Sequence, residues 1–353
     1  MSSQAARSIK GVLTMRMKLR MGRQIVRACV IGCLGCAMAG CFNPDKGKLL
    51  FRPAVGDSRA IGTLTTAAVT FNLMAFQLTF DVGKEARYTF TVKAVDAEGT
   101  ATLDVVYDFV KMKLSTGGEG MPAGLPLAPM LAGLDIGPVN EALNDLAGKS
   151  FTMRVSRHGE VLEVSGADEI ARAMAGRIEP PAGQDATLVQ DAVVGLLGND
   201  GTLMLMSMVL FAAPDQRMKP GDSWQITAAD LTQEAPPQEQ MPGSLEITHT
   251  FKGREHGAAL IDTAVAFELD KDAMAKAMPK GPAPGVEVAF GLTGDGTGTV
   301  RLNDSTGWLI ERSLSGTCTG AIEIANLMGP GTKMAIPIQA TFETRVQDVT
   351  GQS

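Results

Sequence analysis

Cys41 is the residue whose surroundings point most directly to a chemical reaction. It follows two small residues, Ala39 and Gly40, which end an apolar run of thirteen residues, 28–40 (ACVIGCLGCAMAG). The stretch ahead of that run carries basic residues and no acid: Arg16, Lys18, Arg20, Arg23 and Arg27. A positive segment, a short apolar segment and a small-residue cleavage site are the parts of a secretion signal. The sequence therefore predicts a signal peptide over residues 1–40.

The stretch Met38-Ala39-Gly40-Cys41 resembles a bacterial lipobox, in which the cysteine is diacylated and becomes the new N-terminus. Met38 stands where leucine is commoner. One alternative is an ordinary secretion signal whose cysteines are incidental. Another is a retained membrane helix, but thirteen residues rise only about 20 Å against a hydrocarbon core of about 30 Å. We therefore predict palmitate-type acylation of Cys41, with residues 41–51 as a lipidated tether.

The resemblance also implies a location in the cell envelope. Phe42 follows the cysteine, where an aspartate would signal retention in the inner membrane of many Gram-negative bacteria. The expectation is a lipid-anchored protein that faces the periplasm, with the outer membrane preferred over the inner membrane.

The motif Gly-Asp-Ser occurs twice, at 56–58 and 221–223. A hydrolase that used Ser58 or Ser223 would want a downstream histidine with an aspartate three residues before it. None of the histidines is placed in this way (His158, His249 and His256), and no Gly-x-Ser-x-Gly elbow is present. Each copy is interpreted as a turn that begins a strand. No catalytic residue is predicted, and the protein is expected not to be an enzyme.

Metal and cofactor sites are also not predicted. The three histidines do not form a His-Glu-x-x-His pattern. Thioethers suit Cu(I), so Met204, Met206 and Met208 are candidates for a copper site. On a strand all three would share one face, whereas on a helix Met206 would point away from the other two. Their apolar neighbours favour a core segment. The stretch 294–298 (GDGTG) lacks the lysine of a phosphate loop and the spacing of a dinucleotide site, and it is interpreted as a turn entering a strand.

Charge excludes one class of partner. The chain has 32 basic and 38 acidic residues, a net charge of −6. Seven of the bases and none of the acids precede Cys41, so the remainder carries 25 − 38 = −13. An acidic body lacks the basic footprint of nucleic-acid binding and argues against wide contact with anionic headgroups. Membrane attachment is expected through the N-terminal lipid, with a protein or lipid as the possible further partner.

Cysteine usage excludes an internal disulfide. Four of the five cysteines lie at or before the predicted cleavage site (Cys29, Cys33, Cys36 and Cys41), which leaves Cys318. A single cysteine cannot form an intramolecular disulfide, and Cys318 is interpreted as a small buried apolar residue.

Alternation of apolar and polar residues predicts β-hairpins in both halves of the chain. One continuous run is expected over 70–80. In the first half, a hairpin turns at Glu98-Gly99, and its second strand carries one apolar face: Ala101, Leu103, Val105, Tyr107 and Phe109. A second hairpin turns at His158-Gly159. The second half repeats this order, with turns at His256-Gly257 and Ser305-Thr306-Gly307, and ends with 320–324 paired to 334–342.

This order of landmarks predicts a duplication. Residues 52–166 form the first β-rich repeat, 167–217 a helical connector, and 218–353 the second β-rich repeat. Helices are expected at 138–146, 167–177 and 186–197. The apolar stretch 201–213 is expected to be buried whether helix or strand. Pro- and Gly-rich stretches at 115–137, 233–242 and 279–284 are interpreted as loops.

The same landmarks resemble a family of bacterial cell-envelope lipoproteins, the domain of unknown function 6263 family. The matching residues are the lipobox at Cys41, the hairpin of Tyr88 and Gly99, the stretch 158–166, the stretch 219–224 (KPGDSW) and the run from Gly298 to Gly307. The resemblance carries no activity and no catalytic residue. More loosely, long antiparallel strands with helices on one face resemble the half-barrel of lipoprotein carriers, which implies an apolar groove.

The predicted fold is therefore α+β: mainly antiparallel β from two duplicated hairpin-rich halves, with short helices between the halves that pack on the sheet. The predicted function is a membrane-anchored, non-catalytic envelope protein that binds a protein or hydrophobic partner. The alternative is a periplasmic carrier of a lipid or other apolar ligand, held in a groove between sheet and helices.

Overall fold

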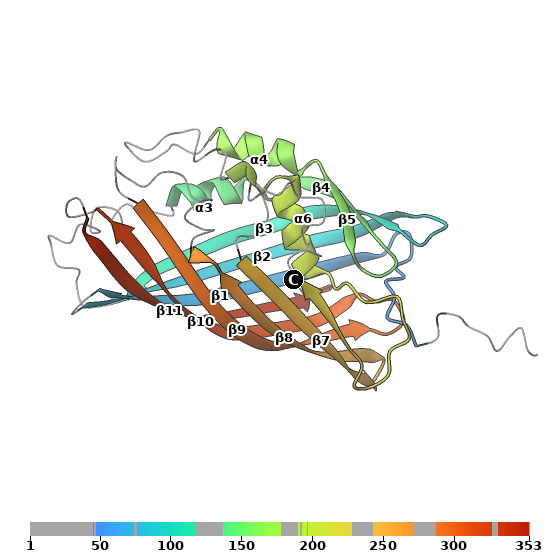
Figure 1. The fold of residues 1–353 in the computed structure, drawn as a ribbon. Helices are drawn as coiled ribbons and strands as arrows, with labels where there is room; N and C mark the ends of the chain where they lie inside the picture. Colours follow the sequence, from blue (N-terminus) through green and yellow to red (C-terminus); the bar gives the residue numbers. More distant parts are fainter. Residues whose placement is uncertain are drawn as a thin grey trace, which may run out of the picture. The chain divides into compact units, whose positions relative to one another are not determined.

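The computed structural model describes residues 45, 47–73, 76–117, 137–177, 190, 193–195, 197–227, 243–271, 287–326 and 331–352. The chain divides into two units at residue 48, and the fold below is that of residues 49–353 (Figure 1). Cys41 and the predicted signal peptide lie outside the described residues, as do most of the three predicted loops.

Eleven described strands form one sheet in which every neighbouring pair is antiparallel. Across the sheet the order is β5-β4-β3-β2-β1-β11-β10-β9-β8-β7-β6. The strands are β1 (Ser58–Leu73), β2 (Phe76–Val95), β3 (Ala101–Gly117), β4 (Ser150–Val155), β5 (Val161–Ser165), β6 (Ser223–Thr227), β7 (Gly243–Glu255), β8 (Ala258–Leu269), β9 (Glu287–Asn303), β10 (Leu309–Ala325) and β11 (Lys333–Asp348). The predicted fold class, mainly antiparallel β with short helices, is confirmed.

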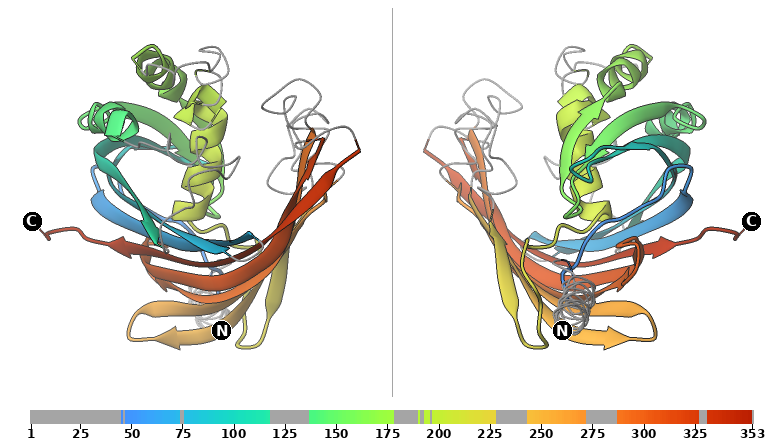
Figure 2. Two further views of the ribbon diagram at one scale, coloured as in Figure 1. Left: turned by 90° about the vertical axis from the view of Figure 1, so that its left-hand side faces the viewer. Right: turned by 90° about the vertical axis from the view of Figure 1, so that its right-hand side faces the viewer.

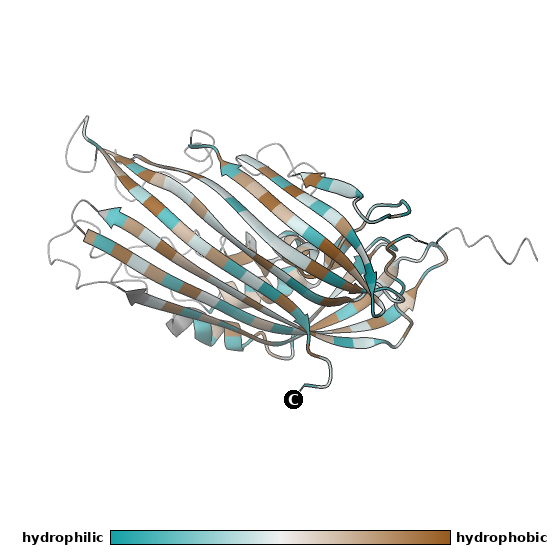
Figure 3. Cartoon of the chain, turned by 90° about the horizontal axis from the view of Figure 1, so that it is seen from below, coloured by the Kyte–Doolittle hydropathy of each residue, from teal (hydrophilic) through white to brown (hydrophobic). Residues whose placement is uncertain are grey.

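Successive side chains on a strand point to opposite faces of the sheet. We call the face that carries Ile61, which packs with residues of the helices, the inner face, and the opposite face the outer face. Figure 3 shows how apolar and polar residues alternate along the long strands. In Figure 2 the sheet curves around helix α6 (Asn199–Val209), so the inner face lies inside the curve.

The main core lies at one end of the long strands. Its largest fully buried side chains are Trp308, Tyr88, Phe90, Phe251 and Ile61. Burial of an aliphatic or aromatic side chain of this kind stabilises a fold by roughly 1.5–3 kcal/mol. Helices α3 (Gly137–Asn144), α4 (Ala167–Ala175) and α6 contribute buried residues to the same core, in agreement with the predicted helices at 138–146 and 167–177.

Side-chain hydrogen bonds hold the helices to one another and to the sheet. The Asn199 Oδ1 atom accepts hydrogen bonds from the backbone N–H groups of Ala167 (3.0 Å) and Asp168 (3.3 Å). In return the Asp168 Oδ1 atom accepts from the Asn199 N–H at 2.8 Å. Each side chain thus satisfies donors that a helix N-terminus leaves open. Asn140 of α3 binds both backbone groups of Met112 on β3 at 2.9 Å, which holds α3 against the sheet.

The two Gly-Asp-Ser turns have the same hydrogen bonds. The Asp57 Oδ2 atom accepts from the Ala54 N–H at 2.9 Å, and the Asp222 Oδ2 atom accepts from the Lys219 N–H at 2.7 Å. Each turn also exchanges two backbone bonds with a strand residue, Val92 in the first copy and Phe251 in the second. The prediction that both motifs are turns at the start of strands, β1 and β6, is confirmed.

Three local expectations are wrong. Residues 70–80 do not form one strand, because Leu73 pairs with Phe76 where β1 ends and β2 begins. A bulge opposite Arg87 and Tyr88 pairs Phe109 with Arg87, so Phe109 leaves the face that carries Tyr107. The stretch 201–213 is not buried all round: it is helical to Val209 and extended from Leu210, and Met204 and Met208 are exposed.

The segment predicted as a tether ends inside the core. Leu49, Leu50 and Phe51 are buried, and the Phe51 ring packs edge-on to Trp308 at 4.9 Å. The Phe51 and Arg52 N–H groups donate to the carbonyls of Arg157 and Thr306. Residues 49–51 are therefore part of the folded body.

Candidate functional site

The pairing register places a row of polar side chains across the inner face, next to the core. Lys84 pairs with Thr65, and Thr65 pairs with Thr344. The row continues through Leu314 and Gly298 to Thr263, which pairs with His249. We call this row the polar belt, with the members Lys84, Thr65, Thr344, Thr263 and His249.

Two threonine hydroxyls of the belt, those of Thr65 and Thr344, lie close together. The Oγ1 atoms of Thr65 and Thr344 are 3.2 Å apart, and either can be the donor. A hydroxyl supplies one donor and two acceptor lone pairs, so this pair can turn donors toward an oxygen-bearing group. Lys84 occupies the neighbouring position on β2.

Lys84 is the cation of this part of the belt. It is half-buried, and burial lowers its pKa because a low-dielectric environment disfavours the charged ammonium. Among the described residues it forms no salt bridge. At neighbouring inner-face positions of β2 stand Val82 and Ala86, so the lysine interrupts an apolar row.

At the other end of the belt, His249 is buried and neutral. Its Nδ1 atom lies 2.9 Å from the Thr263 Oγ1 atom, and its ring packs against Phe211 and Trp224 at 4.9 and 5.2 Å. Burial, with a smaller contribution from the Arg312 charge, lowers the pKa of His249 to about 3. The Arg312 guanidinium donates to the Met208 carbonyl at 2.7 Å, at the C-terminal end of α6.

Beyond the belt, the inner face is apolar. We call this area the apolar lane: the inner-face positions of β2, β1, β11, β10, β9 and β8 beyond the belt. It runs from the row Val82, Ala67, Phe342, Gly316, Gly296 and Val265 to the small cluster around Ile324 and Ile336. From Phe342 to Met334 on β11 it is about 27 Å long at 3.4 Å per residue.

Glycines give the lane its floor. A Cβ atom on Gly316 would lie 2.6 Å from the Phe342 ring, and one on Gly296 would lie 3.2 Å from it. The Phe342 ring therefore covers both glycines. The Phe267 ring covers Gly294 in the same way, beside Cys318. The stretch 294–298 is therefore not a turn, as predicted, but the middle of β9.

The methionines of α6 differ in their exposure. Met204 and Met208 are exposed, whereas Met206 is fully buried, as the helical alternative for these residues requires. The three sulfurs therefore do not face a common point. In Figure 2, α6 stands inside the curve of the sheet, and methionine is suited to adaptable apolar contacts.

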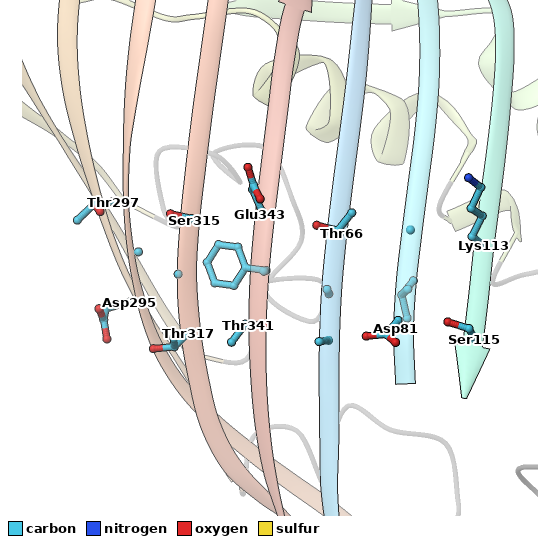
Figure 4. Close-up of a pocket in the computed structure, with 17 residues that line it drawn as sticks. Thr66, Asp81, Lys113, Ser115, Asp295, Thr297, Ser315, Thr317, Thr341 and Glu343 are labelled. Atoms are coloured by element: carbon cyan, nitrogen blue, oxygen red, sulfur yellow. The ribbon is translucent and has the colours of Figure 1, made fainter. Parts of the chain in front are cut away.

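The outer face of the described strands carries two hollows, one of which is shown in Figure 4. One, of about 760 Å³, is lined by residues of six neighbouring strands, among them Thr66, Asp81, Asp295 and Thr341. A second, of about 780 Å³, shares Asp295 and Thr317 with it and adds Glu246 and Glu268. Hydroxyl and carboxylate side chains line both hollows together with residues of the lane, among them Ala67, Val82 and Phe342 in the first.

The remaining residues weighed from sequence have local roles. The Ser58 Oγ atom lies 3.5 Å from Thr91 Oγ1, and the Ser223 Oγ atom lies 2.9 Å from Thr250 Oγ1. His158 and His256 lie in turns, and His249 lies in β7, as predicted. No group of three metal-ligating side chains of the His, Cys, Asp and Glu types occurs in the described part of the chain. Cys318 is half-buried and a free thiol.

Lys84 and the glycines of the lane were not predicted as site residues, although each stands out in the sequence pattern of its strand. Positions 80, 82, 84, 86 and 88 alternate onto one face, and Lys84 is their one polar member. Glycines at 294, 296 and 298 share one face of a strand in the same way. In a strand, such a run marks a close approach of other groups.

The profile of a protein family described as "Family of unknown function (DUF6263)" matches residues 98–309. No curated protein matches the sequence. Among solved structures, lipovitellin is similar at a TM-score of 0.39 and 10% identity, over 84% of this chain and 25% of that one, so the chain spans a quarter of its length. OmpF of Salmonella typhi in complex with daunomycin reaches a TM-score of 0.19 and 6% identity, over 83% and 98% of the chains. Scores this low do not establish a shared fold.

None of the helices in the described ranges has the length and apolarity needed to cross a membrane.

Proposed function

The chain belongs to the family of unknown function DUF6263, and from that premise we propose that it is a non-catalytic binder of a lipid-like apolar ligand. The observation that carries the proposal is the apolar lane, an apolar surface on the inside of a curved sheet. Ligand sites are mostly concave and apolar, with a few polar groups that fix orientation. The belt supplies such groups at one end of the lane.

The dimensions of the lane suit an acyl chain. An acyl chain spans one leaflet of a bilayer, which is about 15 Å of hydrocarbon, half of a core of about 30 Å. The lane is about 27 Å long, so an acyl chain fits along it. The Phe342 and Phe267 rings, which cover glycines of the lane, add apolar surface along which a chain can lie. The described helices make their main contacts with β3, β5 and one another.

Two adjacent alanines on β1 test this proposal, because the pairing register places Ala67 on the inner face and Ala68 on the outer face. Ala67→Trp places a large ring in the lane. We expect it to raise the Kd of the neutral apolar dye Nile red for the full-length protein at least tenfold, about 1.4 kcal/mol. Ala68→Trp adds the same ring outside and should leave the Kd unchanged.

Thermal unfolding of both variants, followed by circular dichroism, separates blocked binding from loss of the fold. Equal dye affinity in the parent protein and a folded Ala67→Trp variant would show that the lane is not the binding surface. Failure of the parent protein to bind Nile red at all would also sink the proposal.

We further propose that this binder is anchored at the periplasmic side of an outer membrane by acyl chains on Cys41. The support is the sequence of the signal, in which small residues and a cysteine follow a short apolar run. Cys41→Ser should move the protein from the membrane fraction to the soluble fraction of lysed cells. Cys36→Ser, in the same apolar run, is the matched control and should remain with the membranes. Retention of Cys41→Ser in membranes would contradict the anchor.

Duplication of the β-rich halves is also proposed. The sheet contains two runs with the same chain order, 5-4-3-2-1 and 10-9-8-7-6, with β11 between them. Corresponding ion pairs support it: Arg154–Glu163 and Arg301–Glu311 follow equivalent bulges, and Lys93–Asp104 and Lys252–Asp262 join equivalent strands. Gly159 and Gly307 occupy equivalent turns with φ of +84° and +74°.

A further inference from the structure

The charges of the strands are divided between the two faces of the sheet. Alternation places the carboxylates of the long strands on the outer face, including Asp81, Asp295, Glu343 and Glu268. In the described strands, the inner face of the belt and lane carries no carboxylate, and the acid found on that face, Asp348, pairs with Arg59 near the core end. Lys84 therefore gives the inside of an acidic protein a local positive charge.

Within the described part of the chain, the Lys84 ammonium has no carboxylate partner of the kind that buried charges ordinarily have. A buried charge is unfavourable unless it is paired and hydrogen-bonded. Lys84 is half-buried beside apolar Val82 and Ala86, and no salt bridge reaches it from the described residues. A ligand that brings its own negative charge would supply the missing partner.

The neighbours of Lys84 complete an anion-binding arrangement. Thr65 lies opposite Lys84 on β1, and its hydroxyl meets that of Thr344. While the two hydroxyls are hydrogen-bonded to each other, one of them keeps a proton that can be donated to an oxyanion, and the ammonium supplies three further donors. The lane begins one row beyond these residues, at Val82, Ala67 and Phe342.

We propose that the ligand is a long-chain amphiphile with an anionic oxygen head, which binds at Lys84, Thr65 and Thr344 while its chain lies along the apolar lane. This inference rests on the proposed function and adds the chemical class and the orientation of the ligand. A carboxylate and a phosphate present the same oxyanion chemistry. A neutral head of the same chain length would leave the Lys84 ammonium unpaired.

Displacement of Nile red from the full-length protein tests the head and the chain separately. The competitors are palmitate, hexadecyl phosphate and hexadecanol, which share a sixteen-carbon chain. In the parent protein, palmitate or hexadecyl phosphate should displace the dye at a concentration at least tenfold lower than hexadecanol, and the better of the two identifies the head. Equal potency of all three would overturn this inference and leave the apolar site standing. No displacement by any of them would overturn the proposed function as well.

Variants at Lys84 assign the preference to its charge. Lys84→Met keeps a long apolar stem and removes the ammonium, so the preference for the anionic competitors should fall to about onefold while hexadecanol binds as before. Lys84→Arg should keep the preference. Lys113→Met removes an exposed charge from the outer face of β3 and should change nothing. A preference that survives Lys84→Met would refute the role of this lysine.

Discussion

Gly159→Ala and Gly307→Ala are each expected to lower the free energy of unfolding by more than about 3 kcal/mol. Both glycines have positive φ, which costs an L-residue about 1–2 kcal/mol. In addition, a Cβ atom would lie 2.1 Å from the Phe211 carbonyl oxygen at Gly159, and 2.3 Å from the Leu50 carbonyl oxygen at Gly307. The backbone would have to move and give up hydrogen bonds worth about 1 kcal/mol each.

Each substitution would disturb a backbone hydrogen bond beside the glycine. The Ala213 N–H donates to the His158 carbonyl beside Gly159, and the Arg52 N–H donates to the Thr306 carbonyl beside Gly307, at 2.8 and 2.7 Å. The segment that leads into each half thus lies against the glycine turn of the other half. Similar losses at the two positions are expected from the proposed duplication, and a large difference between them would count against it.

Gly56→Ala and Gly221→Ala are the matched controls. These glycines also have positive φ, +89° and +95°, but a Cβ atom at either would meet no other atom within 4 Å. We expect each control to lose only about 1–2 kcal/mol, the backbone contribution alone. Urea unfolding of the four variants measures the difference. If Gly159→Ala and Gly307→Ala were no less stable than the controls, the close approach of the two segments would be wrong.

Acidification from pH 7.5 to pH 5 is expected to destabilise the protein by about 2 kcal/mol through His249 alone. Burial lowers the pKa of this histidine to about 3 in the folded protein, whereas an unfolded histidine titrates near 6.5. Below pH 6.5 the unfolded chain therefore binds a proton that the folded chain does not. Stability from this residue is present above pH 6.5 and is lost as the pH falls toward 3.

His249→Phe should remove this part of the pH dependence, because a phenyl ring keeps the packing against Phe211 and Trp224 and cannot be protonated. The variant will be less stable at pH 7.5, since the Thr263 hydroxyl loses its partner. Its free energy of unfolding should nevertheless fall less between pH 7.5 and pH 5 than that of the parent protein. His256→Asn is the control at an exposed turn with φ of +50°, where asparagine is tolerated. Urea unfolding at several pH values measures the slopes, and equal slopes in the parent and His249→Phe would contradict the assignment.

Local pattern was sufficient for the hairpins and short helices. The hairpins at Gly99, Gly159, Gly257 and Gly307 could be predicted because a glycine with positive φ separates two alternating runs. The turn between β1 and β2 could not, since Leu73 and Phe76 are flanked by residues that continue the alternation. Antiparallel pairing along the full length of both strands decides where that turn falls.

The candidate site was predicted only as an unspecified apolar groove. Its members come from β2, β1, β11, β10, β9 and β8, far apart in sequence, and the pairing register alone brings Lys84, Thr65 and Thr344 into one row. The close packing at the β9 glycines likewise follows only from the assembled sheet, because the ring that approaches Gly296 belongs to Phe342 of β11.

The amino-acid sequence by itself determined the acidic character of the body, the alternation of its strands and the candidate acylation position at Cys41, because each depends on neighbouring residues or on composition. The tertiary structure decided which face of each strand is inside, that Lys84 is half-buried there, and that residues 49–51 belong to the core. Burial and pairing depend on contacts between residues distant along the chain, and these form only when the whole sheet is assembled.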